Sequence, residues 1–431
     1  MTDASRGART SPMAWAVWGL VALFYCYGSF QRVAPAVMVP DLMAEFAAGA
    51  ALLGSLSAFY FYAYATLQLP VGLMLDRWGE RRVMTAAAVL AGAGSLLFAI
   101  ADDVGTANLG RLLIGTGSAF TWIGCLTTAA IWFPPRRFAL VAGLSSLAGM
   151  VGAIGAQAPL AALVTAIGWR DSMLWGAAFA FLLAIAIAAV VRDRPRTRQA
   201  PNRPPATVRG LAAGVRVAAA DRQLWIAAFA GCMMSTPVLA FAGLWGVPYL
   251  MAAYELSRPG AALIASVMMI GWAIGGPVFG WLSDRTGRRR RPMIAGAVGA
   301  CVTMAACIYV PGLSTVSVGL LLFVNGFFAG SMILVFAVIR ERHGSGHIGS
   351  AYGLVNTVIM SSGAVFQPLI GLLLDLGWDG RMEAGARVYS RAAYDLAFGT
   401  LPAVFAAGIA AMLLIHETWC RPVTRPAAAE A

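Results

Sequence analysis

The chain has 431 residues, of which 60% are hydrophobic and only 12% are charged, and its mean hydropathy is +0.75. So little charge could not cover the surface of a soluble protein of this size, which excludes a water-soluble globular fold. The formal net charge is +12, and every basic residue is arginine. Most of these arginines fall in the predicted tails and loops of one membrane side, so the basicity indicates topology, and we expect no nucleic-acid partner.

The first predicted element is an apolar run from Met13 to Pro40, preceded by Arg6 and Arg9. The run is too long for the hydrophobic region of a signal peptide, and no small-residue cleavage site follows it. We therefore expect an uncleaved membrane helix, with residues 1–13 forming a cytoplasmic N-terminal tail.

Apolar segments of about 20 residues, enough to cross the hydrocarbon core, recur along the chain. Their approximate bounds are 14–39, 51–75, 83–101, 107–131, 138–163, 170–191, 224–250, 261–282, 293–310, 315–339, 350–375 and 393–416. Twelve spans predict an all-α polytopic membrane protein with both termini in the cytoplasm, including a C-terminal tail at 417–431.

Residues 192–223, between the sixth and seventh spans, are rich in arginine and proline. Such a segment cannot bury apolar surface and is predicted to be a basic cytoplasmic linker, with a short surface helix near 207–220. The linker divides the chain into predicted six-helix bundles at 14–191 and 224–416.

The two bundles repeat a loop sequence, GLMLDRWGERR from Gly72 and GWLSDRTGRRR from Gly280. Three pairs of positions are each offset by 208 residues: Asp76 and Asp284, Arg77 and Arg285, Gly79 and Gly287. Because each half has six spans, the repeats insert with the same orientation. Parallel repeats with a substrate site between them are typical of a secondary transporter.

GLMLDRWGERR resembles the signature loop of the major facilitator superfamily, and NLGRLLIGTGSAF resembles its fourth-helix motif. The resemblance covers about residues 14–416 and implies two parallel, pseudo-symmetric six-helix bundles that work by alternating access. Asp76 and Asp284, with their arginines, are then candidate latches between the halves. Alternatively, the loops are solvated turns whose arginines only set topology.

On the first helix, Tyr25, Ser29 and Arg32 share one face. Arg32 could extend towards the periplasm and pair with Asp41 or Glu45. The helix is, however, similar to that of the organophosphate antiporter and anion:cation symporter branches, which implies that Arg32 faces the cavity and binds an anion. The seventh helix lacks the second arginine of the organophosphate antiporters, which favours an organic acid over a phosphate ester.

Arg111 on the fourth helix corresponds to a cavity-wall arginine of the family, or forms an interfacial ion pair after Asp102 and Asp103. The remaining substrate-binding candidates are polar or aromatic residues inside predicted helices: Tyr60, Tyr64, Gln157, Trp245, Asn356 and Gln367. Gln157 and Gln367 are related by the repeat. For the tyrosines an interfacial aromatic belt is the alternative, and for the small polar residues contacts between helices.

We therefore expect a bacterial inner-membrane transporter of a small, anionic organic solute, a monomer in the bilayer with a proton or counter-anion as a candidate coupling partner. The alternatives are an exporter of drugs or of neutral or amphoteric metabolites, and a transporter-like receptor without net flux. No GxxxxGK[ST] motif occurs, and no nucleophile–base set or metal cluster stands out, so we expect no enzyme activity, cofactor or metal. His343 is expected to be solvated in a loop.

Overall fold

The computed structural model describes residues 11–193, 208–343 and 348–422. We call residues 11–193 the first half and residues 208–422 the second half. The first half consists of helices: α1 (Pro12–Val33), η1 (Ala34–Val37), α2 (Val39–Glu45), α3 (Ala50–Leu67), α4 (Pro70–Trp78), α5 (Glu80–Ala99), α6 (Val104–Ser118), α7 (Thr121–Trp132), α8 (Pro135–Gly155) and α9 (Ala158–Val190).

The second half is also helical, apart from one short hairpin. Its elements are α10 (Val208–Ala219), α11 (Arg222–Pro237), η2 (Val238–Trp245), α12 (Gly246–Tyr254), α13 (Arg258–Thr286), α14 (Arg290–Tyr309), α15 (Thr315–Ala329), η3 (Gly330–Ile333), α16 (Leu334–His343), α17 (Ile348–Leu376), β1 (Met382–Glu383), β2 (Ala386–Arg387), α18 (Arg391–Phe398) and α19 (Thr400–Leu413). The strands β1 and β2 pair antiparallel.

Eleven helical stretches of the described chain are long and apolar enough to cross a membrane. One of them, Arg136–Val190, has 55 residues. At about 1.5 Å per residue it would extend more than twice the roughly 30 Å of a hydrocarbon core. Within this stretch Gly168 has φ 83°, a backbone conformation that interrupts the helix and that glycine adopts without a steric penalty. This stretch therefore contains the predicted fifth and sixth spans, which brings the crossings to the expected twelve.

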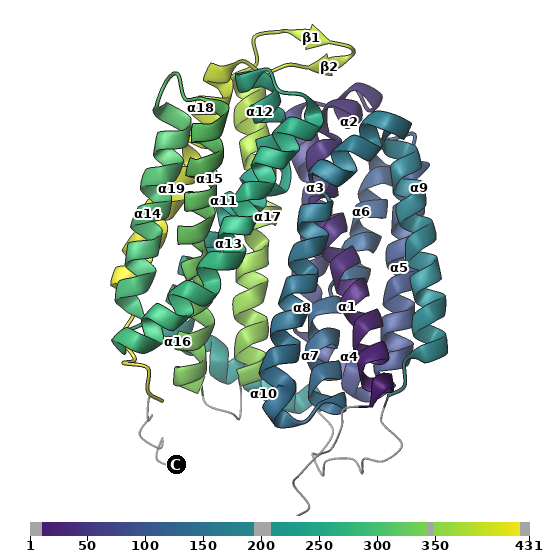
Figure 1. The fold of residues 1–431 in the computed structure, drawn as a ribbon, viewed down its shortest axis with the longest axis vertical. Coiled ribbons are helices and arrows are strands. Elements are labelled where there is room, and N and C mark those ends of the chain that lie inside the picture. Colours follow the sequence, from purple (N-terminus) through teal and green to yellow (C-terminus); the bar gives the residue numbers. More distant parts are fainter. Residues whose placement is uncertain (1–10, 194–207, 344–347, 423–431) are drawn as a thin grey trace, which may run out of the picture.

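The two halves stand side by side, with their long helices nearly parallel (Figure 1). Helices α3 and α17 make the most extensive contact between them. The hairpin β1–β2 and α2 lie at one end of the helices, which we call the hairpin end (Figure 1). The opposite end, which carries α10, is the linker end.

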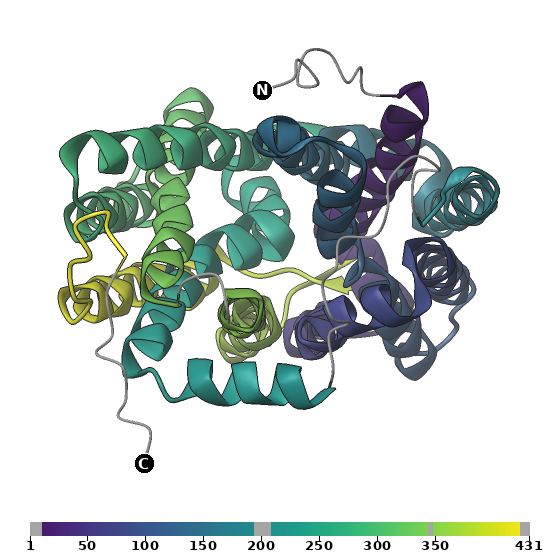
Figure 2. The same cartoon turned by 90° about the horizontal axis from the view of Figure 1, so that it is seen from below.

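The predicted surface helix near 207–220 is confirmed as α10, which packs on α11 and α17. Figure 2 shows it lying flat, whereas α17 beside it is seen nearly end-on. Its arginines Arg209 and Arg216 belong to the basic linker, at the same end as the repeated loops around Gly79 and Gly287.

Candidate functional site

Arg32 lies in the last turn of α1, where the helix dipole favours a cation. Its side chain is half-buried, and its Nε atom is buried without a hydrogen-bond partner among the described residues. Three tyrosines, Tyr25, Tyr60 and Tyr64, are close enough to interact electrostatically with the guanidinium. Arg32 is therefore a cation surrounded by aromatic hydroxyls, with at least one N–H left to bind something else.

The acids that an outward-reaching Arg32 would need have other partners. Asp41 pairs with Arg258 of α13 at 2.8 Å, and Glu45 pairs with Arg170 of α9 at 2.8 Å. Both predicted ion pairs of Arg32 are thus absent from the described structure, where these carboxylates bind other arginines.

Arg111 is also placed differently from the expected interfacial pair. Its side chain is only 1% exposed, and its Nη1 atom donates to the Gln31 carbonyl at 2.7 Å. That carbonyl would normally accept from the residue four positions later, but Pro35 has no N–H. The guanidinium also lies 5.1 Å from the centre of the Tyr60 ring. Arg111 therefore secures the end of α1, next to Arg32, from inside the first half.

Asp103 and Asp102, the expected partners of Arg111, act elsewhere. Asp103 caps α6 by accepting from the Thr106 backbone N–H at 3.0 Å, and Asp102 lies 3.7 Å from Arg170. The hydrogen bonds to Thr106 hold the pKa of Asp103 below its usual value. The alternative of an interfacial ion pair for Arg111 is wrong.

Tyr60 and Tyr64 are buried inside the protein, not placed in a lipid-facing belt. Their rings stack 5.8 Å apart, and the Tyr60 hydroxyl donates to the Gly28 carbonyl at 3.1 Å. The backbone of Tyr60 packs directly on Gly115 of α6, where a Cβ atom would come within 2.3 Å of the Tyr60 carbonyl oxygen. Glycine at this point of the fourth-helix motif lets α3 and α6 pack closely enough to hold Tyr60 beside Arg111.

Tyr25 and Ser29 extend the same face of α1 from Arg32 towards the linker end. Tyr25 is half-buried, and its ring centre lies 5.3 Å from that of Trp122 on α7. The Ser29 hydroxyl is buried close to the Tyr25 hydroxyl. Trp122 was not among the predicted site residues, although it lies on the same helical stripe as Arg111 in the sequence.

The glutamines Gln157 and Gln367 converge on η2 of the second half, not on Arg32. The Gln157 Nε2 atom donates to the Ala242 carbonyl at 2.7 Å, and that of Gln367 donates to the Leu239 carbonyl at 2.8 Å. Trp245 in turn donates to the Gln367 carbonyl at 2.9 Å. A π-helical segment such as η2 is rare and often marks a functional position. Here the Gln157 amide binds η2 across the interface of the halves, whereas the Gln367 amide binds it from within the second half.

Asn356 makes a contact between helices of the two halves. Its Nδ2 atom donates to Oε1 of Gln68, just after α3, at 2.8 Å. The hydroxyl of the next residue, Thr357, donates to the Ala65 carbonyl at 3.1 Å. These bonds join α17 to the end of α3.

In the first repeated loop, Asp76 and Arg77 are exposed and Gly79 has φ 81°. The carboxylate of Asp193, after α9, accepts from the Arg81 backbone N–H at 2.8 Å. At Gly72 a Cβ atom would meet nothing within 4 Å, so in this conformation no neighbouring helix packs against that glycine.

In the second repeated loop, Gly287 has φ 65°, and Arg285 lies 5.4 Å from the centre of the Trp281 ring. Asp284 pairs with Arg289 at 2.6 Å, and Arg289 also pairs with Glu341 of α16 at 2.6 Å. Burial lowers the pKa of Arg289, but the hydrogen bonds to Glu341 and Asp284 outweigh it and raise that pKa above its usual value. These bonds all lie within the second half.

His343 is buried, not solvated as the sequence suggested. Its side chain is 1% exposed and lies 3.2 Å from Asp221, which also pairs with Arg342. The described residues contain no group of three His, Cys, Asp or Glu side chains that could hold a metal ion.

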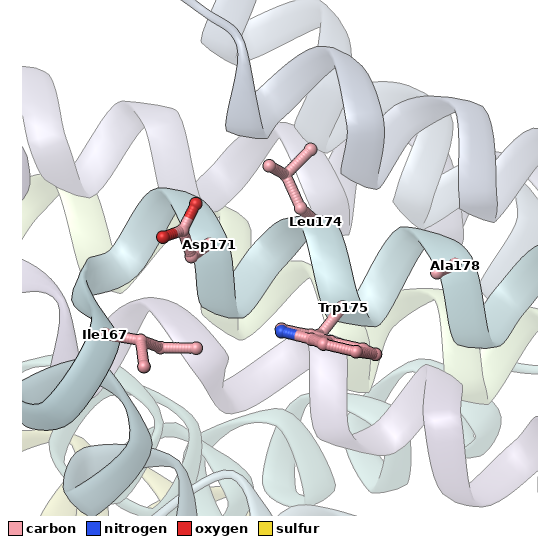
Figure 3. Close-up of a pocket in the computed structure, with 5 residues that line it drawn as sticks. All are labelled: Ile167, Asp171, Leu174, Trp175 and Ala178. Carbon is pink, nitrogen blue, oxygen red and sulfur yellow. The ribbon is translucent and has the colours of Figure 1, made fainter.

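A surface hollow on α9 is lined by Ile167, Asp171, Leu174, Trp175 and Ala178 (Figure 3). Trp175 is 69% exposed there, on the outside of the first half. A second hollow at the hairpin end includes Asp41 and Arg258. Neither contains a predicted substrate-binding residue.

The apolar spans and the cation held between helices define a polytopic α-helical membrane protein with a polar site inside its first half. The sequence profile of the Major Facilitator Superfamily matches residues 19–368, and the chain belongs to this family of transporters.

Among curated proteins, the chain is 30% identical to human monocarboxylate transporter 11 over 86% of this chain and 78% of that protein. It is 23% identical to the gentisate transporter of Corynebacterium glutamicum over 92% of this chain and 87% of that protein. A match to the uncharacterized transporter YybO of Bacillus subtilis is 33% identical but spans only 39% of each chain.

Among solved structures, the fold is similar to a bacterial homologue of the human lysosomal transporter Spinster in an inward-facing and occupied conformation. The TM-score is 0.72 at 16% identity, with 94% of this chain and 97% of that chain covered. A mutant of the nucleoside transporter NupG gives a TM-score of 0.73 at 15% identity, with 94% and 99% covered. The chain is thus a multi-pass membrane transporter, not an enzyme.

Proposed function

We propose that this transporter moves a small organic anion by alternating access and that Arg32 binds the anionic group. The observation that carries the proposal is the state of Arg32: a half-buried guanidinium with an unpartnered Nε–H, surrounded by tyrosines, while Asp41 and Glu45 bind other arginines. An ionisable group inside a membrane bundle is costly and usually serves function, and the guanidinium fork fits a carboxylate.

The names of several relatives support an organic anion as cargo. They include a monocarboxylate transporter, a probable sulfoacetate transporter of Cupriavidus necator, a gentisate transporter and a putative tartrate transporter of Agrobacterium vitis. These solutes are diverse in size, and their shared feature is an acidic group.

We further propose that the linker end faces the cytoplasm of a bacterial inner membrane. Among described residues the hairpin end carries few arginines, namely Arg170, Arg258, Arg381, Arg387 and Arg391, whereas the repeated loops and the linker carry many. This asymmetry is the positive-inside pattern. The domain bounds 14–191 and 224–416, a monomeric state and the latch role of Asp76 and Asp284 are parts of the same proposal.

Counterflow in proteoliposomes across a panel of carboxylates tests the proposal. Arg32→Gln is expected to reduce apparent affinity by about tenfold or more, because a hydrogen bond to a charged group contributes about 1.5–3 kcal/mol. Arg32→Lys keeps the positive charge but not the two parallel N–H donors of the guanidinium. Its apparent affinity should lie between those of the wild type and Arg32→Gln. Arg381→Gln, on the exposed hairpin loop, is the matched control.

Each outcome separates a candidate function. If Arg32→Gln takes up substrate as the wild type does, Arg32 does not bind the substrate. Uptake of neutral or amphoteric solutes in preference to acids would favour an exporter of such compounds. Saturable binding without counterflow would favour a receptor.

A further inference from the structure

The charge near the site favours a ligand with a single negative charge. The first half holds two deep cations, Arg32 and Arg111. Arg111 is 1% exposed, donates from Nη1 to the Gln31 carbonyl and lies against the Tyr60 ring, while its Nε and Nη2 atoms have no hydrogen-bond partner among the described residues. Arg32 is the one whose side chain keeps partial exposure. Of the two charges, that of Arg32 is therefore the one that a ligand can reach in this conformation.

The surface next to Arg32 is aromatic. Tyr25 precedes Arg32 by seven residues, two helical turns or about 10 Å along the axis, so the two share a face. Tyr25 and Trp122 are half-buried, whereas Tyr60 and Tyr64 are buried, so the first pair are the rings with surface left for a ligand.

The position of Tyr25 is tightly set by its neighbours. A Cβ atom at Gly149 of α8 would come within 2.4 Å of the Tyr25 ring, and the Trp122 ring lies 5.3 Å away on the other element. The ring is thus packed between α7 and α8, which restricts its rotation. Rigid aromatic rings with some free surface favour planar partners by offset or edge-to-face contact.

Ser29 lies between the cation and the rings. Its buried hydroxyl lies close to that of Tyr25, and a ligand that bonds to it would use its remaining hydrogen-bonding capacity. A carboxylate oxygen or a ring hydroxyl of a ligand could fill that role.

We propose that the ligand is an aromatic monocarboxylate. Its carboxylate binds Arg32, its ring packs against Tyr25 and Trp122 towards the linker end, and Ser29 donates to one of its oxygens. This inference rests on the proposed function, because it assumes that Arg32 binds the anion, and it adds the class of the organic part.

Isothermal titration of the purified full chain with benzoate, cyclohexanecarboxylate and phthalate tests the inference. Benzoate and cyclohexanecarboxylate have the same carboxylate and carbon count, but only benzoate is planar. Benzoate is expected to bind about fivefold more tightly, the size of one aromatic contact, and phthalate, a dianion near neutral pH, more weakly than benzoate. Trp122→Leu should abolish the benzoate preference and leave cyclohexanecarboxylate unchanged, while Trp175→Leu on the outer face should change neither.

The affinities of the wild-type protein for the three ligands test the inference even if a variant fails to fold. Equal affinity for benzoate and cyclohexanecarboxylate, or tighter binding of phthalate, overturns the aromatic monoanion. If Arg32→Gln abolishes binding of both monocarboxylates equally while their affinities for the wild type are the same, the proposed function stands and this inference fails. If Arg32→Gln binds benzoate normally, the proposed function fails as well.

Discussion

The two ends of the interface between the halves are held in different ways. At the hairpin end, Asp375 of α17 accepts from the backbone N–H groups of Ala50 at 3.0 Å and Ala51 at 2.9 Å, capping α3 of the opposite half. Arg258 and Asp41 form a second tie between the halves at 2.8 Å. At the linker end, the charged network of Arg289 joins only residues of the second half, and the bonds between the halves there are the uncharged ones of Asn356 and Thr357 to the end of α3.

Tyr389 strengthens the hairpin-end tie. Its hydroxyl donates to Asp375 at 2.6 Å and accepts from the Ala50 N–H at 3.0 Å. Burial and this bond to the carboxylate raise the pKa of Tyr389, so it stays protonated and keeps donating. Arg387 of β2 lies 3.2 Å from the same carboxylate.

This difference indicates which end of the interface needs more free energy to open from this conformation. Separating the halves at the hairpin end breaks charge-assisted bonds at a helix N-terminus, which are among the stronger polar contacts. The Arg289 network stays intact through such a movement because it lies within one half. Three substitutions test this contrast, and they are ordered by expected effect.

Glu341→Gln is expected to have the largest effect, on stability. Glu341 and Arg289 have side chains only 10% and 11% exposed, and removing one charge of a buried pair costs about 3 kcal/mol. The midpoint of thermal unfolding should fall, measured by intrinsic fluorescence. Spin labels at Ala47→Cys and Met382→Cys should report an unchanged hairpin-end distance. Glu383→Gln on the exposed hairpin is the control, and a widened hairpin end in Glu341→Gln would contradict the separation of the two networks.

Asp375→Asn is expected to have the next largest effect, on conformation. The amide keeps the shape but loses the charge that stabilises the α3 N-terminus, a change of about 1.5–2 kcal/mol in the closed hairpin end. The same spin-label pair should show the open population rising by about tenfold. Asp379→Asn is the matched control, because Asp379 pairs with Arg381, whose side chain is 72% exposed. An unshifted distance distribution would mean that other contacts hold this end closed.

Gly72→Ala is expected to have the smallest effect. A Cβ atom there has nothing within 4 Å, so stability should change by less than about 1 kcal/mol, in the direction of helix propensity. If a helix of the second half packs against Gly72 when the linker end closes, counterflow should nevertheless slow. Gly280→Ala, equally unobstructed, is the control for helix propensity. Identical rates for the two variants would show that the linker end does not close on Gly72.

Much of the fold could be predicted from the sequence because the decisive signals are local. The length of each apolar run determines a crossing, and the arginine-rich linker separates two groups of runs. The fifth and sixth spans differ in form, because they follow each other in one helical stretch that is interrupted at Gly168. The types of residue in the site could be predicted from the sequence. Which of these residues lie together in space could not. Tyr25, Ser29 and Arg32 share a face by helical spacing, whereas Gln157 and Gln367, equally plausible by symmetry, bind η2 instead.

By itself, the sequence determined the membrane class, the number of crossings, the repeat and the presence of an arginine inside the first span. These follow from hydrophobic length and residue spacing, which act along the chain. Only the tertiary structure decided the partners of the charges. Asp41 follows Arg32 by nine positions yet binds Arg258, which lies 217 residues away. Arg111 binds the carbonyl that Pro35 leaves without a donor. Ion pairs depend on which helix ends meet in space, and that choice leaves Arg32 with a hydrogen-bond donor to spare.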